Sequence, residues 1–302
     1  MRRLIIVYNP NSSQYIHVKE EILSHVTDFK GFLVGKFAIE KASFESNVDR
    51  LAEFLKEGDL VLAAGGDATA AVTANAIMSS KKDATLAVLP YGNFNDLART
   101  LGTMKLDDVK QFSSTAKLYP LAITVNGHFW RYATCYVTMG MTAEAVEIFD
   151  DPKFRKKLQK GRKSSWRSYL ALVKWYFKFR HSKVFIPPFT INGVPCAKNA
   201  SDYCALSGKS MCRIMKGGYD FLKPKTFRSM NWNLTHFWAI SILMLKSIFS
   251  RTPGTDTKGD LIEFIDPATV KLQAEGEYQT FKGTKTIEVK KSPTPIKVII
   301  KK

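Results

Sequence analysis

The chain has 302 residues, of which 45% are hydrophobic and 12% aromatic, and its formal net charge is +18. This composition is typical of a globular protein that buries a core, and the length predicts two domains. Four cysteines without a CxxC spacing exclude a disulfide scaffold, disfavour a zinc site and indicate a reducing compartment.

Apolar segments are too short to span a membrane. The run at 4–8 follows two arginines, but it is shorter than the roughly 7–15 residues of a signal-peptide core and ends in Asn9-Pro10. The run at 237–245 has about half of the roughly 20 residues that a membrane-spanning helix needs. The first run therefore predicts a strand, and the second a short apolar helix.

The first 125 residues alternate between strand and helix patterns. Strands are predicted at about 3–8, 31–38, 59–64 and 84–89, and helices at about 17–27, 44–57, 69–80 and 94–102. This alternation predicts a parallel sheet covered by helices on both faces. The loops at 9–13, 65–69 and 92–96 would then converge at the carboxyl edge of the sheet, where α/β sheets bind ligands.

After residue 117 the pattern becomes β-rich. Asn126-Gly127 separates apolar runs at 118–125 and 128–137 and predicts a hairpin. Gly140–Glu144 predicts the start of a short helix with Thr142 as its cap. From residue 183 on, short β-like runs punctuated by Gly and Pro predict an antiparallel sandwich.

Positive charge is concentrated in the second part of the chain. Residues 1–125 carry 14 basic and 14 acidic residues, whereas residues 126–302 carry 31 and 13. Residues 151–183, called here the basic segment, hold 12 Lys and Arg against Asp151, together with several aromatic residues. Three interpretations stay open: an anionic membrane surface as partner, a nucleic acid as partner, or a solvated basic helix.

The motif at 65–69 carries the clearest chemistry. An apolar run at 60–64 leads into Gly65-Gly66-Asp67-Ala68-Thr69, and a second run leads into Gly92-Asn93-Phe94-Asn95-Asp96. Glycines let a backbone approach a phosphate, and the N–H groups at the start of a helix attract one. The alternative is an ordinary strand-to-helix turn, because Gly-Gly-Asp is common in loops.

Four motifs in this order resemble those of the diacylglycerol kinase catalytic family, which includes sphingosine and ceramide kinases and has NAD kinases as distant relatives. The two loops are similar to its GGDGT and GTxND motifs, Asn9-Pro10-Asn11-Ser12-Ser13 to NPxSG, and Ala274-Glu275-Gly276-Glu277 to the late DGE. In order and spacing the resemblance covers the whole chain. The chain departs from these motifs at Ala68, Asn93 and Glu275, which stand in place of glycine, threonine and aspartate.

The resemblance implies a fold and its domains. It implies an α/β protein with an NAD-kinase-like parallel-sheet N-terminal domain and a β-rich sandwich C-terminal domain. Residues 1–122 would form the nucleotide-binding domain, with 290–302 returning to it, and residues 123–289 would form the lipid-substrate domain, with a cleft between the two.

The resemblance also implies a reaction, the transfer of the ATP γ-phosphate to a lipid alcohol such as diacylglycerol, with Mg²⁺. Glu275 would be the general base, supported by Glu277, and Asp67 and Asp96 would lie near the metal or the transferring phosphate. The residues expected to bind the nucleotide are Asn9, Asn11, Ser12, Ser13, Gly65, Gly66, Asp67, Ala68, Thr69, Gly92, Asn93 and Asn95.

Three functions are weighed on this sequence. The favoured one is a lipid kinase in the cytoplasm, peripheral at the inner face of the membrane, with an anionic membrane surface as partner. The second is a lipid- or nucleotide-binding protein of the same fold in which Ala68 and Glu275 have weakened catalysis. The third is a nucleic-acid-binding protein, disfavoured because only the basic segment supports it. A homodimer is left open.

Overall fold

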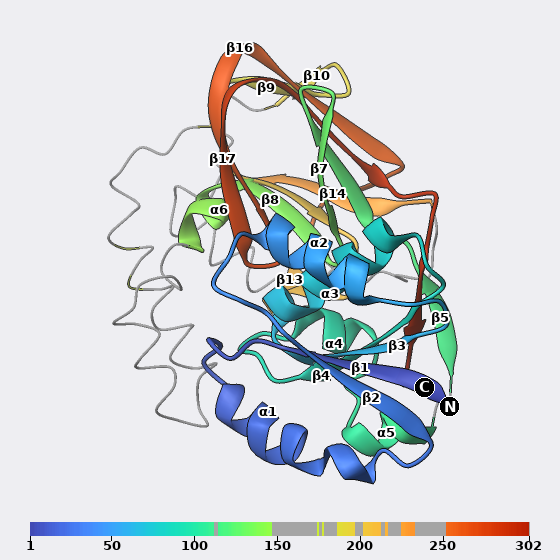
Figure 1. Cartoon of the computed structure of the whole chain (residues 1–302). Helices are drawn as coiled ribbons and strands as arrows, with labels where there is room; N and C mark the ends of the chain where they lie inside the picture. Colours follow the sequence, from blue (N-terminus) through green and yellow to red (C-terminus); the bar gives the residue numbers. More distant parts are fainter. Residues whose placement is uncertain are drawn as a thin grey trace. The chain divides into compact units, whose positions relative to one another are not determined.

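The computed structural model describes residues 1–111, 114–146, 174, 177, 186–196, 202–212, 215–216, 225–232 and 252–301. The chain divides into two compact units, of which the first comprises Met1–Tyr119 and Pro293–Lys302 and the second Pro120–Ser292. Figure 1 draws both units and labels many of their elements.

The first unit is built on a six-stranded sheet of order β2-β1-β3-β4-β18-β5. Its strands are β1 (Arg2–Tyr8), β2 (Phe32–Ala38), β3 (Leu60–Gly65), β4 (Thr85–Pro90), β5 (Thr115–Leu118) and β18 (Ile296–Ile299). Strands β1 to β4 and β18 run parallel, and β5 pairs with β18 in the antiparallel direction. Every residue of β3 is buried, which is typical of a central parallel strand that is covered on both faces.

Helices follow the strands of this unit. They are α1 (Tyr15–Glu21), α2 (Phe44–Phe54), α3 (Asp67–Ser80), α4 (Asp96–Thr100) and α5 (Leu106–Gln111). Ser43 caps the N-terminus of α2, because its side chain accepts a hydrogen bond of 3.1 Å from the N–H of Ser46. Helix α3 is rich in alanine and is buried from Thr69 to Ile77, so its small side chains let it pack into the core.

The helix predicted at 17–27 is interrupted. Helix α1 ends at Glu21, and a 3₁₀ helix (Leu23–Asp28) follows with His25 in a non-helical conformation. The Ser24 hydroxyl donates to the carbonyl of Lys19, and such side-chain bonds to the backbone compete with the regular helix ladder.

The apolar run predicted as one strand at 118–125 divides between the two units. β5 ends at Leu118 and pairs with β18 of the first unit, whereas β6 (Leu121–Val125) pairs with β7 and β17 of the second. Pro120 separates the two strands, and proline has no N–H to donate to a ladder.

The second unit is dominated by a ten-stranded network. Its main path has the order β15-β14-β11-β8-β16-β17-β6-β7, and β9 joins it by pairing with β16. The strands are β7 (His128–Ala133), β8 (Tyr136–Gly140), β9 (Phe189–Ile191), β10 (Val194–Pro195), β11 (Asp202–Leu206), β14 (Phe227–Trp232), β15 (Thr255–Thr257), β16 (Gly259–Ala274) and β17 (Glu277–Lys291), with a separate ribbon of β12 (Ser210–Met211) and β13 (Met215–Lys216). Their pairings are antiparallel.

This network folds over on itself. Leu121 and Ile123 of β6 share one buried core with Tyr203 of β11 and Phe227 of β14, although these strands lie far apart in the pairing order. The long β16–β17 hairpin makes the fold-over, because its register shifts between Glu263 and Val270 and both strands bend (Figure 1). Two sheet layers around one core result.

One turn, one strand run and one helix cap can be compared with the predictions. Asn126-Gly127 joins β6 to β7 with both residues at positive φ, as a two-residue hairpin requires, so this turn is confirmed. The predicted run at 128–137 bends at 134–135, between β7 and β8. Thr142 was wrong as a cap, because it lies inside α6 (Met141–Ala145), where Asp202 accepts from both its N–H and its hydroxyl.

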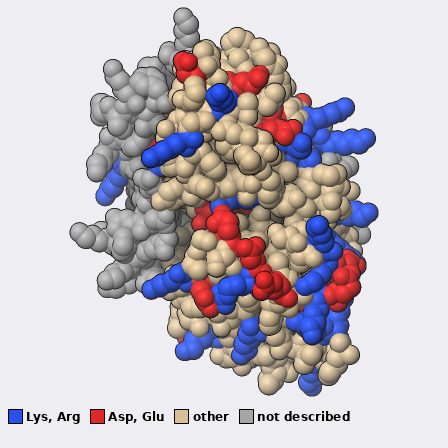
Figure 2. All heavy atoms as spheres, turned by 45° about the horizontal axis from the view of Figure 1, so that its top comes forward, with Lys and Arg blue, Asp and Glu red and all other residues tan. Residues whose placement is uncertain are grey.

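The predicted fold class is confirmed: a parallel α/β unit is followed by a large antiparallel β-rich unit. No helix of the described residues is long and apolar enough to cross a membrane. On the face in Figure 2, Lys and Arg lie in several separate groups with Asp and Glu between them. The basic segment, apart from the exposed Lys174 and Phe177, and the apolar run at 237–245 lie outside the described residues.

Candidate active site

Two glycine loops meet at the carboxyl edge of the first sheet. They follow β3 and β4, which are neighbouring parallel strands, and the N–H of Tyr91 donates to the carbonyl of Gly65 over 3.0 Å. A Cβ on Gly92 would stand 2.4 Å from the Cα of Gly66, and a Cβ on Gly66 would stand 3.1 Å from the Cα of Gly92. The backbones of the two loops are in contact at these positions, so neither position has room for a side chain larger than that of glycine.

Gly65 has a different neighbour. A Cβ there would stand 2.4 Å from the hydroxyl oxygen of Thr69, whose side chain is buried. Thr69 was predicted to donate to a phosphate. In the structure its side chain packs on the backbone of Gly65, so this role does not fit, although the N–H of Thr69 lies in the first turn of α3.

Asp67 joins the two loops. Its carboxylate accepts hydrogen bonds from the backbone N–H groups of Asn95 (2.9 Å) and Asp96 (2.6 Å), with a longer contact of 3.4 Å from Leu97. These groups form the start of α4, whose first N–H groups have no partner within the helix. Asp67, which lies on α3, therefore caps α4 from a neighbouring helix.

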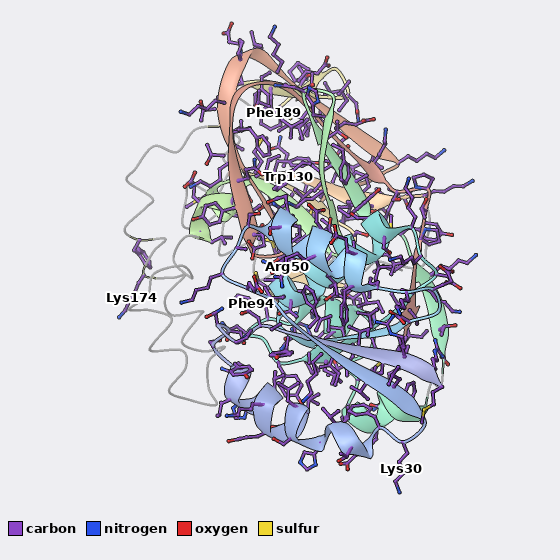
Figure 3. The ribbon with its side chains drawn as sticks, in the orientation of Figure 1. Lys30, Arg50, Phe94, Trp130, Lys174 and Phe189 are labelled. Carbon is purple, nitrogen blue, oxygen red and sulfur yellow. The ribbon has the colours of Figure 1, made fainter. Side chains whose placement is uncertain are left out.

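A second carboxylate lies beside the first. Asp96 is 1% exposed and forms an ion pair with Arg99, which also donates to the carbonyl of Phe94. Burial, and then the charge of Asp96, raise the pKa of Asp67 to about 7. Phe94 lies on the second loop in Figure 3.

Asn95 shapes the second loop. Its side-chain oxygen accepts from the N–H of Gly92 over 2.7 Å, and its side-chain nitrogen donates to the carbonyl of the same residue over 2.8 Å. Its φ of +56° lies in the left-handed region, which asparagine tolerates better than most residues. Asn95 is 7% exposed, so it supports the loop that carries Asn93 instead of facing a ligand.

The loop after β1 keeps part of its side chains exposed. The side chain of Asn9 accepts from the N–H of Asn11 over 2.8 Å, and the N–H of Ser12 donates to the carbonyl of Asn9 over 3.1 Å. Ser12 and Ser13 are half-buried. Since β1 is parallel to β3, this loop lies at the same edge of the sheet as the two glycine loops.

One residue of this edge was missed from the sequence. The Tyr91 hydroxyl donates to the carboxylate of Glu21 on α1 over 2.9 Å and so ties the second loop to that helix. Burial and the carboxylate of Glu21 raise the pKa of Tyr91. The two residues are separated by 69 others in the chain, so no local pattern could have paired them.

Ala68 is unstrained. It lies in the first turn of α3 and is absent from the residues with positive φ. The glycine that the family motif has at this position is therefore not required by backbone conformation. Alanine there also favours the helix by up to about 1 kcal/mol over glycine.

In the second unit, Glu275 lies in the turn of the β16–β17 hairpin. Glu275 and Gly276 both have positive φ, +55° and +94°, as in a type I′ turn. The Glu275 side chain is buried, and its Oε1 atom accepts from the Thr134 hydroxyl and from the N–H of Cys135. Glu277 begins β17 and is half-buried.

Asp67 and Asp96 fit poorly as direct ligands of Mg²⁺. Both Asp67 oxygens accept backbone N–H groups, and Asp96 is paired with Arg99. Among the described residues, no three His, Cys, Asp or Glu side chains lie close enough together to hold a metal ion. The predicted role of these two carboxylates as metal ligands therefore does not match the geometry.

Comparisons with known proteins agree with this architecture. A diacylglycerol kinase from Bacillus anthracis str. Sterne has a similar structure, with a TM-score of 0.70 and 16% identity, covering 99% of this chain and 97% of that one. A diacylglycerol kinase from Bacillus subtilis (strain 168) is 34% identical over 112 residues, and the match covers 36% of each protein's length. The chain thus shares the overall fold of that solved structure.

A family model matches the first part of the chain. Residues 3–124 match the model of the diacylglycerol kinase catalytic domain. Over residues 3–124 this match confirms the resemblance to the diacylglycerol kinase catalytic family that is seen in the motifs of the first loops.

Proposed function

We propose that this protein is an ATP-dependent lipid kinase that transfers the γ-phosphate of ATP to the hydroxyl of diacylglycerol or a related lipid alcohol. The observation that carries the proposal is the meeting of the two glycine loops at the start of α3, within a catalytic domain of this family. The acceptor oxygen forms a bond to the γ-phosphorus, the bond from that phosphorus to ADP breaks, and the hydroxyl proton goes to a carboxylate.

The nucleotide would be held at the start of α3. Helix α3 has 14 residues, and its first residues follow Gly66, which provides no side-chain cap. Backbone N–H groups and the helix dipole favour a phosphate at such an end. The Asn9–Ser13 loop and Asn93 would add polar groups from the same edge of the sheet. Asp67 and Asn95 hold this loop pair in shape, which is a positioning role.

Mg²⁺ would arrive with the nucleotide and offset the charge of its phosphates. Since Asp67 and Asp96 are engaged with protein groups, no step of the proposed reaction is assigned to a metal held directly by them.

Glu275 is the proposed general base. Its carboxylate is held in one orientation by two donors, which reduces the freedom it would lose on meeting the acceptor hydroxyl. The family motif has aspartate at this position. Glutamate has one more rotatable bond than aspartate, so its carboxylate depends more on these two hydrogen bonds for a fixed orientation.

The basic segment is the proposed contact with an anionic membrane surface. Its 12 Lys and Arg against one Asp would attract acidic lipid headgroups, at about 1 kcal/mol for each residue near the surface. The lysines chosen for testing are Lys156, Lys157 and Lys163. A peripheral position at the inner face of the cytoplasmic membrane belongs to the same proposal.

One observation favours a second candidate, a lipid- or nucleotide-binding protein with weak catalysis. Both carboxylates of the glycine loops are engaged with protein groups, and Glu275 replaces the aspartate of the family motif.

The deciding experiment incubates the protein with γ-labelled ATP, Mg²⁺ and vesicles containing diacylglycerol, ceramide, sphingosine or no lipid alcohol. We expect label in one lipid alcohol and none in the vesicles that lack it. Nucleotide binding without label in any lipid would support the second candidate.

A further inference from the structure

Glu275 is held by the bend between β7 and β8. This bend, residues Thr134 and Cys135, supplies both donors to the Oε1 atom of Glu275. Glu275 also has a φ of +55°, which is uncommon for a residue other than Gly, Asn or Asp. A residue with an uncommon backbone conformation and a buried carboxylate that accepts two hydrogen bonds marks a position that the surrounding structure fixes.

The turn itself is also supported. With its amide oriented to suit its neighbours, the buried Gln273 accepts from the N–H of Glu275 over 3.2 Å and from that of Gly276 over 2.7 Å, and it donates to the Thr138 hydroxyl over 2.7 Å. The main chain of the turn is thus fixed separately from the carboxylate.

The bend is fixed from its other side by the end of β11. The carbonyl of Cys135 accepts from the N–H groups of Ser207 (2.6 Å) and Gly208 (2.9 Å). The same peptide segment thus faces Glu275 with its N–H and Ser207 with its carbonyl. A displacement of residues 207–208 would move the donors of Glu275.

Lys291 closes this chain of contacts. It ends β17, at the opposite end of the hairpin from Glu275, and is 9% exposed. Its ammonium donates to the hydroxyl of Ser207. Three contacts, Lys291 to Ser207, Ser207 to Cys135 and Cys135 to Glu275, therefore connect the last residue of the hairpin to its own turn.

Burying an ammonium group is unfavourable, so this lysine needs an explanation. Burial lowers the pKa of Lys291 to about 8, and the neighbouring Cys135 thiol opposes this shift, so the group is largely cationic at neutral pH. A methionine of similar length would fill the space without that cost.

We infer that Lys291 is a positioning residue for Glu275. It acts through Ser207, which bonds to the carbonyl of Cys135, and the N–H of the same residue holds the carboxylate of the proposed base. This inference rests on the proposed function, because it assigns a purpose to the orientation of Glu275. Without the Lys291 contact the N–H of Cys135 is held less firmly, so the carboxylate keeps its bond to Thr134 but loses part of its orientation. Misplacing a reacting group by about 1 Å costs on the order of 100-fold in rate.

The first test compares Lys291→Met with Lys290→Met. Lys290 is the preceding residue of β17, but its side chain is 51% exposed and pairs with Glu288, so it is a matched control. We expect Lys291→Met to lower kcat about tenfold or more at unchanged KM for ATP, and Lys290→Met to leave both unchanged. Equal kcat values for Lys291→Met and wild type would overturn the inference.

The second test asks whether Lys291 acts through Glu275. Glu275→Gln removes the base, which costs roughly 10²- to 10⁴-fold in rate. In that background we expect Lys291→Met to have no further effect on the residual kcat. If it lowers kcat by the same factor as in wild type, Lys291 serves the fold in general and the inference fails.

A third measurement does not depend on activity. Hydrogen–deuterium exchange of the peptide that contains Cys135 reports on the N–H bonded to Glu275. We expect faster exchange there in Lys291→Met and unchanged exchange in Lys290→Met. Faster exchange in a protein that phosphorylates no lipid would refute the proposed function and leave the contact chain standing. Unchanged exchange would refute the contact chain.

Discussion

Gly92→Ala tests why the two loops carry glycines. The new Cβ would stand 2.4 Å from the Cα of Gly66, whereas ordinary contacts of this kind are longer than about 3.4 Å. Because both sides are backbone, the loops must move apart by about 1 Å. That movement breaks the bond from the N–H of Tyr91 to the carbonyl of Gly65. The same Cβ would stand 2.8 Å from the side-chain oxygen of Asn95, and so displaces the oxygen that accepts from the N–H of Gly92.

The expected loss follows from these contacts. Overpacking costs about 1–3 kcal/mol, and each of the two hydrogen bonds contributes about 1 kcal/mol, so we expect the free energy of unfolding to fall by about 3–5 kcal/mol. Gly66→Ala, with its contact at 3.1 Å, should cost clearly less. Gly259→Ala, with its nearest contact at 3.6 Å and no positive φ, is the control.

The assay is urea unfolding without nucleotide, followed by an ATP titration of each variant. If the glycines serve the contact between the loops, Gly92→Ala is destabilised before any nucleotide is added. Wild-type stability of Gly92→Ala combined with weaker ATP binding would refute this reasoning and would show that the glycines serve only the approach of a phosphate.

Three further predictions concern charge and backbone. Because the pKa of Asp67 is raised, the stability that its protonated carboxyl contributes is fully present below about pH 4 and is lost as the pH rises through about 7. We therefore expect the melting temperature of Asp67→Asn to rise relative to that of wild type when thermal unfolding is measured from about pH 4 to about pH 7. Ala68→Gly should keep wild-type kcat and lose at most about 1 kcal/mol in urea unfolding, since Ala68 is unstrained in α3; a large gain in kcat would contradict this. Changing the three chosen lysines of the basic segment to glutamate should abolish the salt-sensitive part of co-sedimentation with anionic vesicles and leave ATP affinity unchanged. Vesicle binding that changes neither with salt nor with these substitutions would show that the basic segment does not contact the membrane.

The sequence was sufficient to predict the sheet edge of the first unit. Parallel strands end at the same edge, so the strand pattern alone brings the loops at 9–13, 65–69 and 92–96 together. The turn at Asn126-Gly127 was predictable for a local reason as well, because both residues accept positive φ.

The partners of the site side chains were not predictable. Asp67 was expected to face a ligand, but it caps α4, a helix that begins 29 residues later. Whether Asp67 faces a ligand or α4 depends on how α3 and α4 pack, and the hydrophobic periodicity of the sequence does not predict that packing. Thr69 likewise faces Gly65 because α3 lies close to β3.

The second unit shows the same limit at longer range. The contact of Lys291 with Ser207 joins residues that are 84 positions apart in the chain. Trp130, which is labelled in Figure 3, bonds to Gln279 across 149 residues, because β7 and β17 both pair with β6. Such contacts depend on which strands become neighbours in the sheet, and short β-like runs in a sequence do not reveal that.

The most direct test of the account is a pair of reactions with wild-type protein, Mg²⁺ and the lipid alcohol that accepts label, one with γ-labelled and one with α-labelled ATP. We predict that label enters the lipid fraction only from γ-labelled ATP, and that Glu275→Gln lowers this transfer by about 100-fold or more while binding ATP as wild type does. Full transfer by Glu275→Gln, or no lipid labelling from γ-labelled ATP by wild type, would contradict the account.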